Sequence, residues 1–180
     1  RAIASAVKLP IVVYSVQGRT GVNVEPATLV RLAAIDNIVA VKEASGSINQ
    51  MGAILNQVPS TFAVLSGDDS ITLPLLALGG HGLISVASNE IPAEMTQLVK
   101  LARSGDFAGA RAIHRKYLDL MDVNFVESNP IPVKTGLSLM GLIDPVYRLP
   151  LVPPSEASRA KISRVLEACG LLARRSMHAD

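Results

Sequence analysis

The sequence predicts an α/β fold in which parallel strands alternate with helices. Four apolar runs rich in β-branched residues recur at intervals of roughly 20 to 28 residues, the spacing of βα units in a parallel sheet. Segments of helical period lie between these runs. After Asp106 the period is helical throughout. We therefore predict four βα units over residues 1–105, a three-helix region over residues 106–172 and a disordered tail over residues 173–180.

The expected strands are near-continuous apolar stretches, as in parallel sheets that are covered on both faces. Each lies between helical segments and is bounded by proline, glycine or polar residues. The four strands are expected over Pro10–Val16, Ile38–Lys42, Thr61–Leu65 and Leu83–Val86.

The helices are delimited by residues that start or stop a helix. Pro26 favours the first turn of one helix, Pro59 ends the next, and Gly79 and Gly105 end the two after it. These helices are expected from Glu25-Pro26 through Leu32 and over Asn49–Val58, Ser70–Leu78 and Ile91–Arg103. In the C-terminal region Asp106 is a suitable N-cap. The helices there are expected from Asp106 through Phe125, over Pro132–Met140, and from Ser155 or Glu156 to Ala168 with Gly170 at C′.

Composition excludes several classes of function. Hydrophobic residues make up 49% of the chain and charged residues 18%, which is typical of a globular protein. Aromatic residues are only 3% and the net charge is +2, so neither a stacking platform nor a strong field for nucleic acid is expected. No apolar run reaches the length of a membrane span, and no membrane partner is expected. The lone Cys169 excludes a disulfide framework and favours a reducing compartment, so we expect a cytoplasmic protein.

Four βα units leave the topology open. A closed (β/α)8 barrel needs eight such units. Four parallel strands alone have two unpaired edges. The chain is therefore either an open α/β layer or half of a barrel whose other half is elsewhere. Its first residue is Arg1, so we expect it to begin inside a longer reading frame or to have been processed.

Lys42 is the leading candidate for catalysis. It ends an apolar strand, where an ammonium loses hydration, and desolvation favours the neutral amine that attacks carbonyl groups. The alternative is a lysine paired to a carboxylate at the end of the sheet. Active groups of parallel sheets gather at the carboxyl ends of strands, so Tyr14 on the preceding strand is a candidate proton shuttle. Its alternative role is that of a half-buried strand tyrosine with a bonded hydroxyl.

Other polar residues near the strand ends are weaker candidates. Arg19 follows the first strand in a loop and can bind a substrate carboxylate, or it is an exposed loop arginine. Gly67-Asp68-Asp69 is interpreted as a tight turn with an aspartate capping the helix near Ser70. The three histidines do not have metal-ligand spacing, so no metal is expected and structural roles are favoured for His81, His114 and His178.

Five sequence blocks follow one another along the chain. They are Val13-Tyr14-Ser15-Val16-Gln17-Gly18-Arg19-Thr20-Gly21, Val41-Lys42-Glu43-Ala44-Ser45-Gly46, Leu65-Ser66-Gly67-Asp68-Asp69, Gly79-Gly80-His81-Gly82-Leu83-Ile84-Ser85-Val86 and Asn129-Pro130-Ile131-Pro132-Val133-Lys134. Together and in this order they resemble the dihydrodipicolinate synthases, part of the class I pyruvate aldolase family that includes N-acetylneuraminate lyase. The resemblance covers roughly residues 5–172 and implies the C-terminal half of a (β/α)8 barrel followed by three helices.

The resemblance implies an enzyme of lysine (diaminopimelate) biosynthesis that needs no external cofactor. Pyruvate would form an imine with Lys42, and the derived enamine would attack L-aspartate 4-semialdehyde to give 4-hydroxy-tetrahydrodipicolinate. Tyr14 would shuttle protons and Arg19 would bind the carboxylate of the aldehyde. Gly67 and the backbone of Ile84 would line the pyruvate pocket. The sequence departs from the family pattern at Ser15, in place of Asn, and at Gln17, in place of Pro, which is expected to loosen the Arg19 loop.

The resemblance also implies an incomplete site. The family's chain has four further βα units before this point, and they carry a Thr-Thr pair and a tyrosine lent by a neighbouring subunit. A partner is therefore expected, either a complementary N-terminal half-barrel or another copy in a homo-oligomer. Two alternatives remain: a related 2-oxo-acid aldolase or lyase, and a non-catalytic truncated paralogue that acts as an assembly module.

Overall fold

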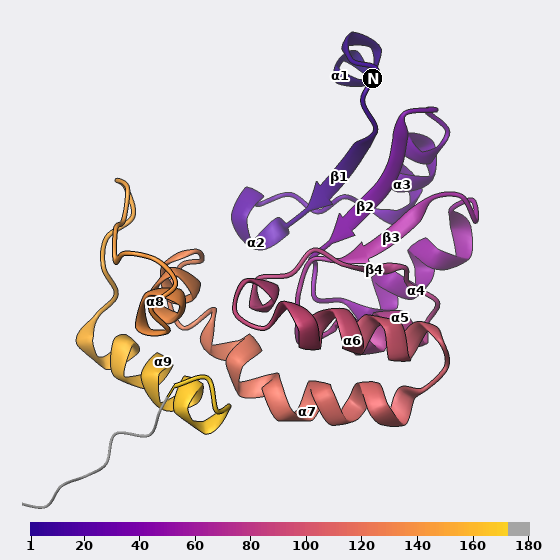
Figure 1. The fold of residues 1–180 in the computed structure, drawn as a ribbon. Coiled ribbons are helices and arrows are strands. Elements are labelled where there is room, and N and C mark those ends of the chain that lie inside the picture. The colour runs from indigo at the N-terminus through magenta and orange to yellow at the C-terminus, as the bar shows by residue number, and fades with distance from the viewer. Residues whose placement is uncertain (173–180) are drawn as a thin grey trace, which may run out of the picture. The chain divides into compact units, whose positions relative to one another are not determined.

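In the computed structural model, which describes residues 1–172, four parallel strands lie side by side in the order β1-β2-β3-β4 (Figure 1). The strands are β1 Ile11–Ser15, β2 Ile38–Glu43, β3 Ala63–Ser66 and β4 Gly82–Leu83. The predicted order and parallel sense are confirmed. No antiparallel pair and no strand after Asp106 occurs within residues 1–172. The predicted tail over residues 173–180, with His178, lies outside the described residues.

The helices agree with the predicted order, with bounds shifted by a few residues. Three short elements were not predicted, namely α1, α2 and the 3-10 helix η1. The helices are α1 Ala2–Ala6, α2 Gln17–Thr20, α3 Pro26–Ala33, α4 Ile48–Gln57, α5 Thr72–Ala77, η1 Ala87–Asn89, α6 Pro92–Arg103, α7 Phe107–Val123, α8 Ile131–Leu139 and α9 Glu156–Ala168.

The chain divides into two compact units. Unit 1 comprises Arg1–Ser85 and Gln97–Arg111, and unit 2 comprises Val86–Thr96 and the residues from Ala112 onward. Unit 1 contains the whole sheet, and unit 2 contains η1, α8 and α9. Helices α6 and α7 each contribute to both units. The domain boundaries suggested by the sequence pattern, at residues 105 and 172, stay a prediction.

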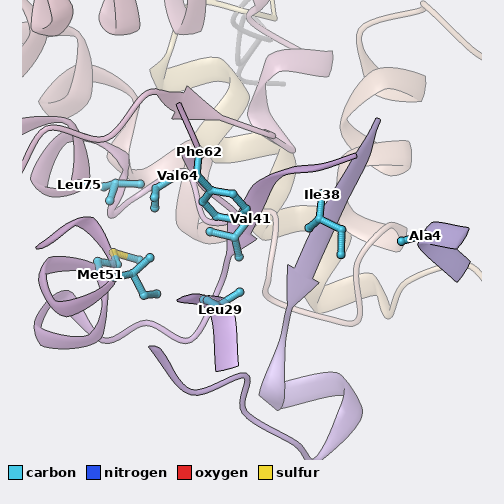
Figure 2. Packing of buried hydrophobic residues seen from close by; sticks show 9 residues of the cluster. Ala4, Leu29, Ile38, Val41, Met51, Phe62, Val64 and Leu75 are labelled. Atoms are coloured by element: carbon cyan, nitrogen blue, oxygen red, sulfur yellow. The ribbon is translucent and has the colours of Figure 1, made fainter. Parts of the chain in front are cut away.

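The core of unit 1 lies between the sheet and the helices that follow β1, β2 and β3. Figure 2 shows Leu29 of α3 and Met51 of α4 beside Val41 of β2. Each large side chain buried in this layer contributes about 1.5–3 kcal/mol to stability. The buried members of the cluster are Ala4, Leu29, Ile38, Val41, Met51, Ile54, Phe62, Val64 and Leu75.

Unit 2 contains a buried polar contact beneath α8. The Nδ2 of Asn124 donates to Oε2 of Glu90 at 2.6 Å, and both residues are buried. A Cβ on Gly136 of α8 would collide with the Glu90 carboxylate, so this glycine permits the close approach. The segment after α8 is tied back by Tyr147, whose hydroxyl lies 2.7 Å from Thr135 Oγ1. Because Thr135 donates its proton to Ile131 O, Tyr147 is the donor of that bond.

The helix ends largely follow the sequence signals. Oδ1 of Asp106 accepts a hydrogen bond from Gly109 N at 2.8 Å, which confirms it as the N-cap of α7. Ser155 caps α9, and Gly170 has the left-handed φ of +76° expected just beyond that helix. The predicted aspartate cap near Ser70 is wrong. The N-cap of α5 is Ile71, and no side chain caps this helix. The Asp68 carboxylate instead accepts the backbone N–H of Ser70, two residues later in the chain.

No helix within residues 1–172 is both long enough and apolar enough to cross a membrane.

Candidate active site

Lys42 and Tyr14 lie side by side at the carboxyl ends of neighbouring strands. Their Cα atoms are register partners in the β1–β2 ladder, so both side chains project from the same face of the sheet. The Nζ of Lys42 lies over the Tyr14 ring, 4.0 Å from its centroid. A cation in this position gains about 0.5–1 kcal/mol at an exposed site. The contact holds the amine and the phenol within reach of one small carbonyl compound.

The face that carries this pair is not the face that packs against the helices. Val13 and Val41, which alternate with Tyr14 and Lys42, belong to the core cluster. Lys42 itself is partly exposed, and 48% of Tyr14 is exposed. The expectation that both faces of these strands are covered is therefore wrong for residues 1–172. The exposure of Lys42 comes from the open face, because its sequence neighbours Val41 and Glu43, which project from the other face, are fully buried.

Gly67 leaves room for the lysine side chain. A Cβ at this position would lie 3.2 Å from Lys42 Cε and 2.7 Å from Ala44 Cβ. Its backbone N–H donates to Glu43 O at 2.7 Å, which extends the β2–β3 ladder by one residue. Gly67 therefore lies directly beside Lys42, and its role in a pyruvate pocket stays a prediction.

Ile84 follows the short strand β4, which ends at Leu83 rather than at the predicted Val86. Its N–H donates to Ser66 O at 2.9 Å, so this donor is already occupied within the sheet. Its side chain is 41% exposed. The next residue, Ser85, donates from its hydroxyl to Oδ1 of the buried Asp69.

Arg19 is not in a loop, as predicted, but in the single helical turn α2. Gly21 closes this turn with a left-handed φ of +70°, and its N–H bonds Gln17 O. Gln17, whose substitution for proline was expected to loosen the segment, lies at the start of the turn. Its side-chain amide donates to Ser45 O at 3.4 Å, and Ser45 lies two residues beyond the end of β2. The Arg19 side chain is exposed.

Within residues 1–172, neither Cys169 nor the histidines His81 and His114 form a second reactive centre. Burial raises the pKa of the Cys169 thiol, assisted by Asp119, so a thiolate is disfavoured. His81 has the structural role that was predicted, since its Nδ1 accepts the Val64 N–H at 3.1 Å. Within residues 1–172 no three His, Cys, Asp or Glu side chains are placed to hold a metal ion.

Sequence reasoning missed the residues behind Lys42. Glu43 is fully buried on the opposite face of β2, and Gln50 of α4 donates to it at 2.9 Å. Asn23 in turn bonds Gln50. A buried acidic residue next to the lysine was visible in the pattern, because Glu43 continues the inward alternation of Val41.

The comparison with known families agrees with this geometry. Residues 1–169 match the model of the dihydrodipicolinate synthetase family. The chain belongs to that family. A 4-hydroxy-tetrahydrodipicolinate synthase of Koribacter versatilis is 54% identical over 172 residues, which cover 96% of this chain and 57% of the relative. Such a match over nearly the whole chain confirms the resemblance inferred from the five sequence blocks.

Solved structures give the same result. The dihydrodipicolinate synthase of Thermotoga maritima is 46% identical and superposes with a TM-score of 0.92, covering 95% of this chain and 59% of that one. A chloride-inhibited synthase of Acinetobacter baumannii, solved with pyruvate, is 42% identical with a TM-score of 0.92 over 95% and 59% of the two chains. These matches confirm the α/β fold of parallel βα units with a helical C-terminal region, as part of the family's barrel. The chain spans less than two thirds of the length of these relatives.

Proposed function

We propose that this chain supplies the lysine-bearing part of a Schiff-base synthase. The reaction is the condensation of pyruvate with L-aspartate 4-semialdehyde to 4-hydroxy-tetrahydrodipicolinate, a step of lysine biosynthesis through diaminopimelate. The observation that carries the proposal is the contact of Lys42 Nζ with the Tyr14 ring at the carboxyl ends of adjacent parallel strands. The related A. baumannii synthase, solved with pyruvate, supports the choice of keto acid.

In the proposed reaction the neutral amine of Lys42 attacks C2 of pyruvate. Tyr14 transfers protons so that the carbinolamine loses water and becomes an imine. Loss of a methyl proton gives an enamine, whose carbon attacks the aldehyde carbon of the second substrate. The amino group of that substrate then attacks the imine carbon, closes the ring and releases Lys42. One water is lost overall and no external cofactor is consumed.

The remaining site residues have binding roles in this proposal. The guanidinium of Arg19 binds the carboxylate of the aldehyde substrate as a bidentate partner. Gly67 keeps the space beside Lys42 Cε open for pyruvate. In this proposal the backbone of Ile84 lines the same pocket through its carbonyl, because its N–H is already bonded to Ser66 O.

We propose further that the sheet of unit 1 is completed by additional βα units. Within residues 1–172, β1 pairs only with β2 and β4 only with β3. Large exposed side chains lie on these two outer strands or next to them, namely Val12 and Tyr14 on β1 and Ile84 just after β4. Unpaired edges and exposed apolar surface favour association. The complement is a half-barrel preceding this segment, on the same or a separate chain, or another copy in a homo-oligomer.

The test is borohydride trapping with pyruvate in the polypeptide that carries this sequence. A peptide containing Lys42 should gain the mass of the reduced adduct, and Lys42→Ala should abolish it. Lys100→Ala, which removes an exposed lysine of α6, is the matched control and should trap normally. An adduct that persists in Lys42→Ala would show that the nucleophile is another residue.

A coupled assay with aspartate semialdehyde then separates the alternatives. Trapping without condensation indicates a related aldolase or lyase that uses another aldehyde. No trapping at all, in a folded protein, indicates the non-catalytic paralogue. Light scattering on the same sample gives the oligomeric state of the active species.

A further inference from the structure

A buried carboxylate lies directly behind the proposed nucleophile. Glu43 follows Lys42 on β2 and projects from the opposite face, where it is 0% exposed. Its Oε1 accepts hydrogen bonds from Ser45 N at 3.2 Å and from Gln50 Nε2 at 2.9 Å. Its Oε2 is buried and has no hydrogen-bond partner among residues 1–172. Burying a carboxylate costs free energy that its hydrogen bonds must offset. The donors to Glu43 are therefore expected to be held in well-defined positions.

Gln50 connects this carboxylate to the segment between β1 and α3. The side-chain amides of Gln50 and Asn23 form a reciprocal pair, with Asn23 Nδ2 to Gln50 Oε1 at 2.8 Å and Gln50 Nε2 to Asn23 Oδ1 at 3.1 Å. Asn23 Nδ2 also donates to Oε1 of Glu25 at 2.7 Å. A continuous chain of hydrogen bonds thus runs from buried Glu43 to exposed Glu25.

Helix capping does not account for the position of the Gln50 side chain. Ser47 is the N-cap of α4 and accepts the Gln50 backbone N–H at 3.1 Å, so Gln50 stands at the third helical position. A glutamine there usually bonds back to the N-cap amide. Here the Ser47 amide donates to Ser45 Oγ at 3.1 Å instead. The side chain of Gln50 is thereby committed to Glu43 and Asn23.

The segment joined to Glu43 in this way is itself tightly folded and carries Arg19. Arg19 N and Thr20 N both donate to Val16 O, at 2.9 and 3.1 Å. The Thr20 hydroxyl donates to Val22 O at 3.0 Å, one residue before Asn23. These bonds connect the backbone next to Asn23 with the turn that carries Arg19.

We propose that Glu43, Gln50 and Asn23 form a positioning network that fixes the Arg19 turn relative to Lys42. The proposal rests on the function proposed above. Glu43 follows Lys42 on the same strand, and Asn23 lies two residues after Gly21, which closes the turn that carries Arg19. The network thereby sets the spacing between the imine carbon and the group that binds the aldehyde's carboxylate. These are positioning residues, which act through Lys42 and Arg19 and do not contact substrate themselves.

Two variants and one matched control test the network in the polypeptide that carries this sequence. Gln50→Met keeps the length of the side chain and removes both of its donors. Gln57→Met makes the same change at an exposed position of the same helix. Asn23→Ala cuts only the outer link and leaves the bond between Gln50 and Glu43 in place. Each protein is measured by hydrogen exchange of its backbone amides, by pyruvate trapping and by the KM for aspartate semialdehyde.

In Gln50→Met we expect amide exchange over residues 16–24 and 43–47 to rise about tenfold, with β3 and α5 unchanged. The KM for the aldehyde should rise by about tenfold or more, since small displacements of a binding group are costly. Asn23→Ala should raise the aldehyde KM similarly while pyruvate trapping stays within about twofold of wild type. Gln57→Met should leave all three quantities unchanged.

Exchange that is unchanged in Gln50→Met, or that rises equally throughout unit 1, would overturn the proposal, because the network would then be absent or only stabilising. An unchanged aldehyde KM in both variants would overturn it as well. Failure of the proposed function is seen separately, as absence of pyruvate trapping in the wild-type protein. The exchange measurement still decides in that case whether the two segments are coupled.

Discussion

The Nζ of Lys42 lies 4.0 Å from the centroid of the Tyr14 ring, and the Cα atoms of these two residues are register partners on neighbouring strands. The ring thus supports the lysine side chain from one side, and Gly67 leaves space on the other. In the proposed reaction the phenol therefore has two separable roles, support of the amine by its ring and proton transfer by its hydroxyl.

Substitutions at Tyr14 should separate these roles. Tyr14→Phe keeps the ring against Lys42, so the fold and the amount of trapped imine at equilibrium should be retained. Turnover should fall about 10²–10⁴-fold, the usual contribution of a positioned proton-transfer group. Tyr14→Leu also removes the ring contact and should slow imine formation further. Turnover of Tyr14→Phe equal to wild type in the coupled assay would remove Tyr14 from the mechanism.

Gly67→Ala should damage the lysine site more than the fold. The new Cβ would lie 2.7 Å from Ala44 Cβ and 3.2 Å from Lys42 Cε, so one of these groups must move. We expect a loss of about 1–3 kcal/mol in the free energy of unfolding, as for other overpacked sites. The rate of pyruvate trapping should fall in addition. Gly18→Ala is the control, because a Cβ there meets nothing within 4 Å. Equal trapping rates in the two variants would contradict the placement of Gly67.

His81 should stabilise the β3–β4 edge through its neutral ring. Its Nδ1 accepts the Val64 N–H, so the proton of the neutral imidazole is on Nε2. His81→Ala leaves a buried strand amide without its acceptor and should lower the free energy of unfolding by about 1–3 kcal/mol. His81→Asn should recover part of this loss, since its side-chain oxygen can replace Nδ1. Urea unfolding of the three proteins makes the comparison, and no difference between Ala and Asn would exclude the hydrogen bond as the cause.

His114 should make the protein less stable in mild acid. Burial holds the pKa of its imidazole below the ordinary value, an effect that Asp122 only partly offsets. The unfolded chain therefore binds the proton more readily than the folded one. The free energy of unfolding falls as the pH is lowered through the ordinary histidine pKa of about 6.5. The free energy of unfolding of His114→Gln should decline less than that of wild type over this interval. Parallel pH profiles for the two proteins would contradict the assignment.

The sequence allowed the order and parallel sense of the strands to be predicted, because four apolar runs at the spacing of βα units permit few other arrangements. It did not allow α2 to be predicted, since four residues containing Gly18 have no helical period. The prediction of an aspartate cap near Ser70 failed because the Asp68 carboxylate accepts the N–H of Ser70, two residues ahead. Aspartate side chains can form such local turns as well as helix caps, and the two bonds compete.

The candidate site, like the fold, could be predicted from the sequence only in part. Lys42 and Tyr14 were expected to converge because parallel strands present their carboxyl ends at one edge, whereas the place of Gly67 beside them was implied only by the family resemblance. The Glu43 network was not expected, because it depends on a contact between Asn23 and Gln50, which are 27 residues apart. The local pattern Ser47-x-x-Gln50 even favours a different bond for the glutamine. Local signals thus led to the proposed reacting groups but not to the residues that we propose hold them in register.

Lys42 and Glu43 are consecutive residues that serve opposite faces of one strand. The lysine adds little to packing, whereas the carboxylate next to it is part of the interior. A duplicated gene could therefore lose the amine by one substitution and still encode a folded protein. Loss of the adjacent acid would disturb the interior and the proposed network together. In descendants of this chain, cellular abundance would not report on activity, and the identity of residue 42 would have to be read directly.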